Sequence, residues 1–308
     1  MLFGHMTVTA LSYGQTDSLS AGEGFIEVTG GKVWYKIVGG GTSIPLLMLH
    51  GGRGVSSIYL KPLEALADQR PVVFFDQLGC GNSPGPADTS LWTIEKFVEQ
   101  IAAVRKALNL KQVHLYGHSW GTMLAIDYML GEPTGVQSLI LAGPVFSIER
   151  HIQDKVKLLQ TLPDSISKTI MKNEQAGTLD SPDYMPAMIV FLGQFFARKQ
   201  PWSDELNQAF ATLNHGLGGY MFGPYSFRST GTLAGYNRTD RLGEIKLPTL
   251  LIVGEYDQCA PATAKYYQSL IPGAELVIIE NAGHLTMHDE PEADIKAIGD
   301  FLNRVENE

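Results

Sequence analysis

Gly117-His118-Ser119-Trp120-Gly121 is the stretch that decides the fold of this chain. It lies between residues 113–116, an apolar run typical of a short buried strand, and residues 122–129, whose apolar side chains recur at helical spacing. A sharp turn from strand to helix holds a serine in a strained backbone conformation, and small residues on either side let the strand and the helix approach closely. The pattern therefore predicts a serine presented as a nucleophile, as in a serine hydrolase.

The length and composition agree with an enzyme built around one large core. The chain has 308 residues, 44% of them hydrophobic, and sheet-and-helix folds carry about 200 residues or more on a single core. The net charge is −9 and no basic run is present, which argues against nucleic acid as a partner because phosphate binding depends on clustered Lys and Arg. We expect one core plus a cap, acting on a small molecule or a short peptide.

Cysteine usage and hydropathy exclude several other classes. Cys80 and Cys259 are the only cysteines, too few for a disulfide framework, and no Cys/His cluster has the spacing of a zinc site. The first twenty-five residues contain His5, Asp17 and Glu23 without an uninterrupted apolar segment, and no run is long enough to span a bilayer. We therefore expect a soluble protein of the cytoplasm, with no membrane association and no metal.

Strand and helix signals alternate at both ends of the chain. Residues 24–37 are typical of a hairpin with its turn at Gly30-Gly31, and residues 93–108 of an amphipathic helix with Thr93 as its N-cap. Further strands are expected at 45–49, 72–75, 113–116, 138–142, 249–253 and 275–279, and a closing helix at 292–305. This alternation predicts an α/β fold with a mostly parallel sheet and helices on both faces.

Residues 146–241 follow a different pattern, with helical segments rich in Met, Phe and Gln, several proline breaks and no convincing strand. We interpret them as a helical cap between two parts of the core, residues 1–145 and residues 242–308. An insertion between strands of an open parallel sheet lies over their carboxyl ends, where ligands bind, so such a cap excludes water and shapes the pocket. The alternative is a separate helical domain with no role in the site.

A serine hydroxyl needs a histidine base, and usually a carboxylate that orients this base. Asp257 and His284 follow two predicted strands, 249–253 and 275–279, and the order Ser, Asp, His is that of α/β hydrolases. All three side chains are expected in loops at the carboxyl edge of the sheet.

Two other histidines compete with His284 for the role of base. His118 adjoins the nucleophile and is expected to pack beside it, and His288 is expected one helical turn after His284 on an exposed face. Because His284 lies in a strand-end loop and completes the order Ser, Asp, His, it is the preferred base.

The oxyanion of a tetrahedral intermediate is best stabilised by fixed backbone N–H groups. His50-Gly51-Gly52-Arg53-Gly54 follows a buried strand, and its glycines permit close backbone approach. We assign the first donor to Gly51, with Gly52 as the neighbouring possibility, and the second donor to Trp120. A plain turn or a phosphate-binding loop is the alternative, but neither this loop nor Gly79-Cys80-Gly81 completes a dinucleotide or Walker fingerprint.

Several motifs resemble those of the proline iminopeptidase family of α/β hydrolases. They are His50-Gly51-Gly52-x-Gly54, Asp76-Gln77-x-Gly79-Cys80-Gly81-x-Ser83, Gly117-x-Ser119-Trp120-Gly121, Gly254-Glu255-Tyr256-Asp257 and Gly283-His284. The resemblance covers nearly the whole chain, and residues 223–240 are similar to the version that includes the tricorn-interacting aminopeptidases. It implies Ser119, Asp257 and His284 as the catalytic triad, Gly51 and Trp120 as oxyanion donors, and no metal or organic cofactor.

The chain departs from this family at positions that hold the substrate. Members that remove an N-terminal residue bind its ammonium with acidic side chains, and here those positions read Ser226 and Gln258. An ammonium buried without a carboxylate is costly, so the loss of both acids weakens recognition of a free N-terminus unless another acid, such as Glu255, replaces them. Arg53 stands where the family usually has proline, and it either meets an anionic or carbonyl-bearing substrate or is a solvated surface residue.

Three function classes follow. The leading one is an acyl hydrolase that cleaves an amide, ester or lactone in a small substrate without requiring a free amine. The alternative is a true proline iminopeptidase with a rearranged ammonium site. A non-enzymatic binding protein is the third, and the intact triad and oxyanion elements argue against it. The oligomeric state is left open.

Overall fold

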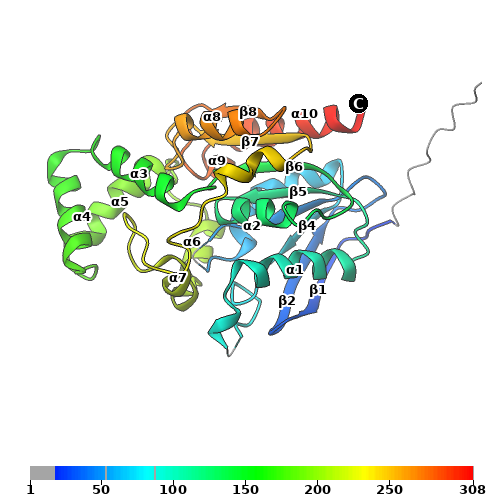
Figure 1. The fold of residues 1–308 in the computed structure, drawn as a ribbon, viewed down its shortest axis with the longest axis horizontal. Helices are drawn as coiled ribbons and strands as arrows, with labels where there is room; N and C mark the ends of the chain where they lie inside the picture. The colour runs from blue at the N-terminus through cyan, green and yellow to red at the C-terminus, as the bar shows by residue number, and fades with distance from the viewer. Residues whose placement is uncertain (1–17, 53, 87, 308) are drawn as a thin grey trace, which may run out of the picture.

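The described residues form one eight-stranded sheet (Figure 1). The computed structural model describes residues 18–52, 54–86 and 88–307. The strands lie in the order β1-β2-β4-β3-β5-β6-β7-β8. Their bounds are Gly22–Val28 (β1), Gly31–Val38 (β2), Leu46–Leu49 (β3), Val72–Phe75 (β4), Val113–His118 (β5), Val136–Ala142 (β6), Thr249–Gly254 (β7) and Glu275–Ile279 (β8). The β1–β2 hairpin is antiparallel and joins β4 antiparallel, whereas all later pairs are parallel, as expected for an α/β hydrolase.

The inner strands bury side chains on both faces of the sheet. On β3, Leu47 and Leu49 belong to one hydrophobic cluster, while Leu46 and Met48 belong to another on the opposite face. Successive side chains of a strand point to opposite faces, so a strand covered on both sides is apolar throughout. This explains why the predicted strands read as continuous apolar runs rather than alternating ones.

Helices cover both faces of the sheet. One cluster joins it to α1 (Ile94–Ala107), α2 (Trp120–Met129) and α8 (Pro261–Leu270). The other joins it to the 3₁₀ helix η1 (Ser57–Asp68), α9 (Thr286–Asp289) and α10 (Pro291–Asn307). Two short 3₁₀ helices, η2 (Thr89–Leu91) and η3 (Thr239–Glu244), lie in connections. Among the helices of the described residues, none has the length and apolar character needed to cross a membrane.

The sequence-based elements are confirmed with small shifts at their ends. The Thr93 hydroxyl caps α1 by accepting the Lys96 backbone N–H, as the N-cap prediction requires. Neither η1 nor α8 was predicted. A proline inside η1, Pro62, interrupts the helical pattern, and α8 buries only a short apolar stripe against β7 and β8, so neither carries a clear periodic signal.

Five α-helices follow one another between β6 and β7, and we call them the cap helices. Their bounds are Ile148–Leu159 (α3), Asp164–Ala176 (α4), Tyr184–Phe195 (α5), Asp204–Ala211 (α6) and His215–Phe222 (α7). In Figure 1, α3, α4 and α5 gather beyond one end of the sheet. Side chains of these three helices share a hydrophobic cluster with Phe227, while α6 packs against η1. The cap helices therefore have a small core of their own and also contact the sheet domain.

Candidate active site

Ser119 occupies a strained turn between β5 and α2. Its backbone has φ 53° and ψ −116°, a conformation that residues other than glycine rarely adopt. The flanking glycines are required by close packing: a Cβ on Gly117 would lie 2.5 Å from the Gly121 carbonyl oxygen, and one on Gly121 would lie 2.1 Å from the Leu49 oxygen. The turn therefore has the geometry of a nucleophile elbow.

His284 and Asp257 are joined at the carboxyl edge of the sheet, in the loops after β8 and β7. The distance from His284 Nδ1 to Asp257 Oδ1 is 2.7 Å, and both residues are buried. The same Asp257 oxygen accepts the Cys259 backbone N–H at 2.7 Å, which fixes the carboxylate. Because a carboxylate accepts hydrogen bonds, His284 carries a proton on Nδ1 and keeps Nε2 as its acceptor.

Ser119 and His284 line the same cavity. Within the part of the chain that the structure describes, no hydrogen bond joins the Ser119 hydroxyl to His284. Such bonds are often long in a free enzyme and tighten when substrate binds. The arrangement can perform proton transfer once Ser119 Oγ and His284 Nε2 come within hydrogen-bond distance.

A glycine at the end of β6 makes room for the histidine ring. Gly143 has φ +54°, and a Cβ at this position would lie 2.6 Å from His284 Cε1 and 2.8 Å from Nδ1. It would also lie 3.5 Å from Asp257 Oδ2. No sequence signal singled out Gly143, because its role arises only when β6, β7 and β8 lie side by side.

The prediction that Gly51 donates to the oxyanion is wrong. Its backbone N–H donates to the Tyr59 hydroxyl at 2.6 Å, so this hydrogen is already used in the buried interior. Both glycines line the cavity, but no described residue accepts a hydrogen bond from the N–H of Gly52, the neighbouring possibility. Trp120 begins α2, so its N–H has no acceptor within the helix. A Cβ on Gly52 would lie 2.6 Å from Trp120 Cβ, which places the two residues side by side.

Gln77 ties the glycine loop to Trp120. Its side-chain amide donates to the His50 carbonyl oxygen at 3.0 Å and accepts the Trp120 indole N–H at 2.8 Å. The Gln77 backbone N–H also donates to His50 Nε2 at 2.9 Å. His50 therefore carries its proton on Nδ1 and donates to the Gly51 carbonyl oxygen at 2.8 Å. Burial lowers the pKa of His50, which favours this neutral form.

His118 packs beside the nucleophile, as expected, and has a structural role. The Tyr59 hydroxyl accepts from Gly51 and so donates its own hydrogen to His118 Nδ1, at 2.8 Å. His118 Nε2 then donates to the His284 carbonyl oxygen at 3.0 Å. Burial, together with the nearby His284, holds the pKa of His118 well below its ordinary value. His118 is therefore a neutral link between the glycine loop and the histidine loop.

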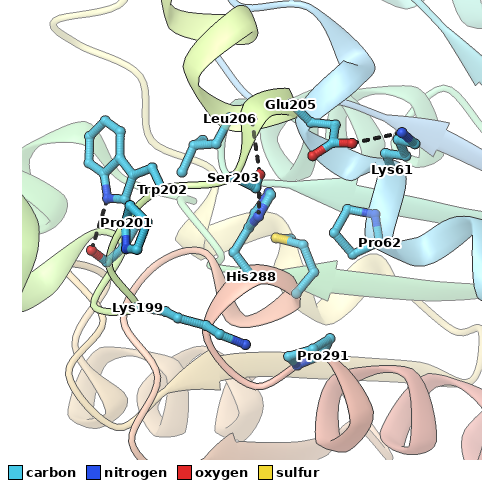
Figure 2. A pocket seen from close by; sticks show the side chains of 12 residues that line it. Lys61, Pro62, Lys199, Pro201, Trp202, Ser203, Glu205, Leu206, His288 and Pro291 are labelled. Atoms are coloured by element: carbon cyan, nitrogen blue, oxygen red, sulfur yellow. Dashed lines mark hydrogen bonds and ion pairs between the residues drawn. The ribbon is translucent and has the colours of Figure 1, made fainter.

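His288 is not on an exposed face, contrary to expectation. Its ring is half-buried, and Nε2 donates to the Tyr59 carbonyl oxygen at 2.6 Å. Figure 2 shows it beside Ser203 in a second cavity of about 380 Å³, which does not include Ser119 among its lining residues. A residue held away from the serine has no role as its base.

The cavity at Ser119 has a volume of about 610 Å³ and is mainly apolar. Its walls come from the elbow, the glycine loop, the histidine loop and the cap helices α3, α5, α6 and α7. Among the described residues, the cationic side chains of Lys155 and Arg228 line it. Among the described residues that line this cavity there is no Asp or Glu.

Only some of the predicted substrate-binding residues line the cavity. Ser226 and Gln258 line the cavity. Glu255 does not: it is exposed, and its carboxylate accepts the Asn281 backbone N–H at 3.0 Å outside the cavity, so the expectation that it replaces the missing acids is wrong. Arg53 lies outside the described residues.

A buried acid that the sequence did not reveal supports the wall near Ser226. Glu174 on α4 is 2% exposed. It accepts the Tyr184 hydroxyl at 2.6 Å and the backbone N–H groups of Ser226 and Phe227 at 2.8 and 3.3 Å. Its oxygens face these donors behind the wall rather than the cavity, so Glu174 positions the loop.

Three potential metal ligands meet at the triad, Asp257, Cys259 and His284, with ligand atoms within 4.8 Å of one another. Their contacts already explain this proximity. Asp257 Oδ1 and His284 Nδ1 are bonded to each other, and the Cys259 thiol donates to the Gly143 carbonyl oxygen at 3.4 Å.

Comparison with known proteins gives consistent matches. A family model described as the alpha/beta hydrolase fold matches residues 44–291. A proline iminopeptidase of Heyndrickxia coagulans is 42% identical over 289 residues, which cover 92% of this chain and 99% of that relative. The crystal structure of a proline iminopeptidase of Mycobacterium smegmatis matches with a TM-score of 0.87 and 28% identity, over 92% of this chain and 98% of that chain. The crystal structure of VinJ matches with a TM-score of 0.88 and 29% identity, over 92% and 99% of the two chains.

Proposed function

The chain belongs to the proline iminopeptidase family of α/β hydrolases, and we propose that it cleaves an amide, ester or lactone bond in a small substrate without requiring a free amine. Membership makes it a hydrolase with a serine nucleophile. The absence of a requirement for an amine is the specific part of the proposal. One observation carries it: the described residues that line the cavity include two cations and no carboxylate.

The proposed reaction uses the residues brought together at the carboxyl edge of the sheet. Ser119 Oγ attacks the substrate carbonyl while His284 Nε2 takes its proton, and Asp257 stabilises the imidazolium that forms. The backbone N–H groups of Gly52 and Trp120 bind the oxyanion. Collapse of the tetrahedral intermediate expels the leaving group, which receives the proton from His284, and water then hydrolyses the acyl-enzyme by the same steps.

We propose that residues 146–241 form the cap of this site, between core segments 1–145 and 242–308. The support is that side chains of α3, α5, α6 and α7 line the cavity together with Ser119. Apolar walls that exclude water strengthen the electrostatic interactions of the oxyanion and the imidazolium.

The proposal includes a small molecule or a short peptide as the substrate and the cytoplasm as the location. The net charge of −9 argues against nucleic acid. The two cysteines, Cys80 and Cys259, are free thiols in the interior, which is consistent with a reducing compartment.

The amine dependence is tested by comparing proline p-nitroanilide with its N-acetyl form. Because no acid among the described lining residues meets an ammonium, blocking the amine removes a desolvation cost and loses no compensating bond. We expect kcat/KM for the N-acetyl form to be at least equal to that for the free amine. Ser119→Ala is the control that subtracts background hydrolysis.

A true proline iminopeptidase is the second candidate, and the names of the relatives favour it. This function needs an ammonium anchor other than Ser226, Gln258 and Glu255. A preference of a hundredfold or more for free proline p-nitroanilide would establish such an anchor and make this candidate the leading one.

A further inference from the structure

One face of α3 carries a basic side chain into the cavity of Ser119. Ile148, His151, Ile152 and Lys155 all line the cavity, at the positions i, i+3, i+4 and i+7 that share one face of a helix. Lys157, two residues further along, is exposed to solvent instead. The position of Lys155 in the cavity therefore follows from helical geometry.

Lys155 is held in place by the loop after α7. The residue is only 7% exposed, and its ammonium donates to the Ser226 carbonyl oxygen. The ammonium also lies 5.2 Å from the centre of the Phe227 ring. A carbonyl oxygen and an aromatic face both attract an ammonium group. The Ser226 backbone is itself fixed by Glu174, so the ammonium is positioned in advance of binding.

Arg228 adds a second positive charge from the same loop. Its guanidinium stacks 3.4 Å from the centre of the Tyr225 ring, and the residue lines the cavity while remaining open to solvent. Lys155 contacts this loop at Ser226 and Phe227, and Arg228 is the next residue of the same loop. Glu174, the nearby acid, is 2% exposed and is engaged by three donors behind this wall.

We propose that this wall is an anion subsite, and that the substrate carries a carboxylate or a similar anionic group that Lys155 and Arg228 bind. The subsite rests on the proposed hydrolase function, because it selects the substrate of that same serine. An anionic group entering the mainly apolar cavity gains charge-assisted hydrogen bonds from cations that are already in place. An ammonium entering the same cavity meets like charge.

Pairs of p-nitrophenyl and phenyl esters test the subsite. Mono-p-nitrophenyl adipate and p-nitrophenyl hexanoate share a six-carbon acyl chain and differ by a terminal carboxylate. 4-Carboxyphenyl hexanoate and phenyl hexanoate place the same difference on the leaving group, with product release followed by chromatography. We expect kcat/KM of the wild-type protein to favour the carboxylate member of at least one pair by about tenfold or more, after correction for the non-enzymatic rates.

Variants identify the group responsible for the preference. Lys155→Met keeps the length of the side chain and removes its charge, so we expect the preference to fall toward one. Lys155→Arg retains a cation, so we expect it to keep most of the preference for the carboxylate ester. Lys157→Met is the matched control on the exposed face of α3, and it keeps the wild-type preference. If Lys155→Met fails to fold, Arg228→Gln and the loss of preference with added salt provide the same test.

The outcomes separate this subsite from the proposed function. If the neutral hexanoates are hydrolysed only with Ser119 intact, but neither carboxylate ester is preferred, the subsite is wrong and the hydrolase function stands. A preference that persists in Lys155→Met, or in Arg228→Gln and at high salt, also overturns the subsite. If no ester of either pair is hydrolysed in a manner that depends on Ser119, the proposed function itself fails.

Discussion

The backbone N–H of Gly51 donates to the hydroxyl of Tyr59 at 2.6 Å, and both residues are buried. Because this bond occupies the Gly51 N–H, we propose Gly52 as the oxyanion donor paired with Trp120. Because the same hydroxyl donates to His118, which in turn donates to the His284 carbonyl, one tyrosine connects the oxyanion loop to the histidine loop. Tyr59 is a positioning residue in this account.

Tyr59→Phe should lower kcat by about tenfold with a smaller change in KM. The substitution leaves the Gly51 N–H and His118 Nδ1 without their partner in the interior, at a cost of about 1–3 kcal/mol, and loosens the loop that carries Gly52. Steady-state kinetics with p-nitrophenyl hexanoate and a thermal melt provide the measurement.

Tyr116→Phe is the matched control for this experiment. The Tyr116 hydroxyl is buried and has no hydrogen-bond partner among the described residues, so its removal breaks no bond. We expect wild-type kcat and a Tm at least equal to that of the wild type. Unchanged kcat in Tyr59→Phe, alongside an inert Tyr116→Phe, would show that the Tyr59 contact does not position the site.

Gly143→Ala should reduce kcat by tenfold or more. The added methyl group would lie 2.6 Å from the His284 ring, and φ +54° is strained for alanine, so the ring must move away from its position beside Asp257. Gly193→Ala in α5 is the control, because its Cβ meets nothing within 4 Å and alanine stabilises a helix. Activity of Gly143→Ala equal to that of the control would contradict the packing described for His284.

Asp294 should make the stability of the protein depend on pH. Burial raises the pKa of this fully buried carboxyl on α10 to about 7, against about 3.9 in an unfolded chain. The folded state therefore binds the proton more tightly, and its stabilising effect is complete below pH 4 and is lost as pH rises toward 7. Asp294→Asn removes this dependence.

Urea unfolding at pH 5, 6, 7 and 8 measures the effect. The free energy of unfolding of Asp294→Asn relative to the wild type should rise with pH, by up to about 1.4 kcal/mol per pH unit, and level off above pH 7. A difference between the two proteins that stays constant over this range would show that Asp294 does not titrate as described.

Local patterns were enough to predict the strands, the elbow and the His284–Asp257 pair. Ser119, Asp257 and His284 each follow a strand of the parallel part of the sheet, and parallel strands bring such loops to one edge. Gly117 and Gly121 predict the close approach of β5 and α2. The structure gives the reason, because a Cβ at either position would clash with backbone atoms.

Contacts between distant segments could not be predicted in the same way. The hydrogen bond from Gly51 to Tyr59 depends on how η1 packs against the glycine loop. The sequence of η1 has no clear helical period, so this packing could not be predicted. Glu255 was favoured as a substitute acid on sequence position alone, yet its carboxylate faces Asn281. The sequence does not reveal Lys155, because a single lysine on an amphipathic helix gives no sign of a cavity on that side.

The most direct test of the account is the mass of the intact protein after treatment with a small fluorophosphonate. If Ser119 is the nucleophile activated by His284, one adduct should form per chain, and peptide mapping should find it on Ser119. Ser119→Ala should remain unlabelled and lose hydrolytic activity by a factor of about 10⁴ or more, while its fold persists because Ser119 is half-buried and lines the cavity. A stoichiometric label on another residue, or wild-type turnover in Ser119→Ala, would contradict the account.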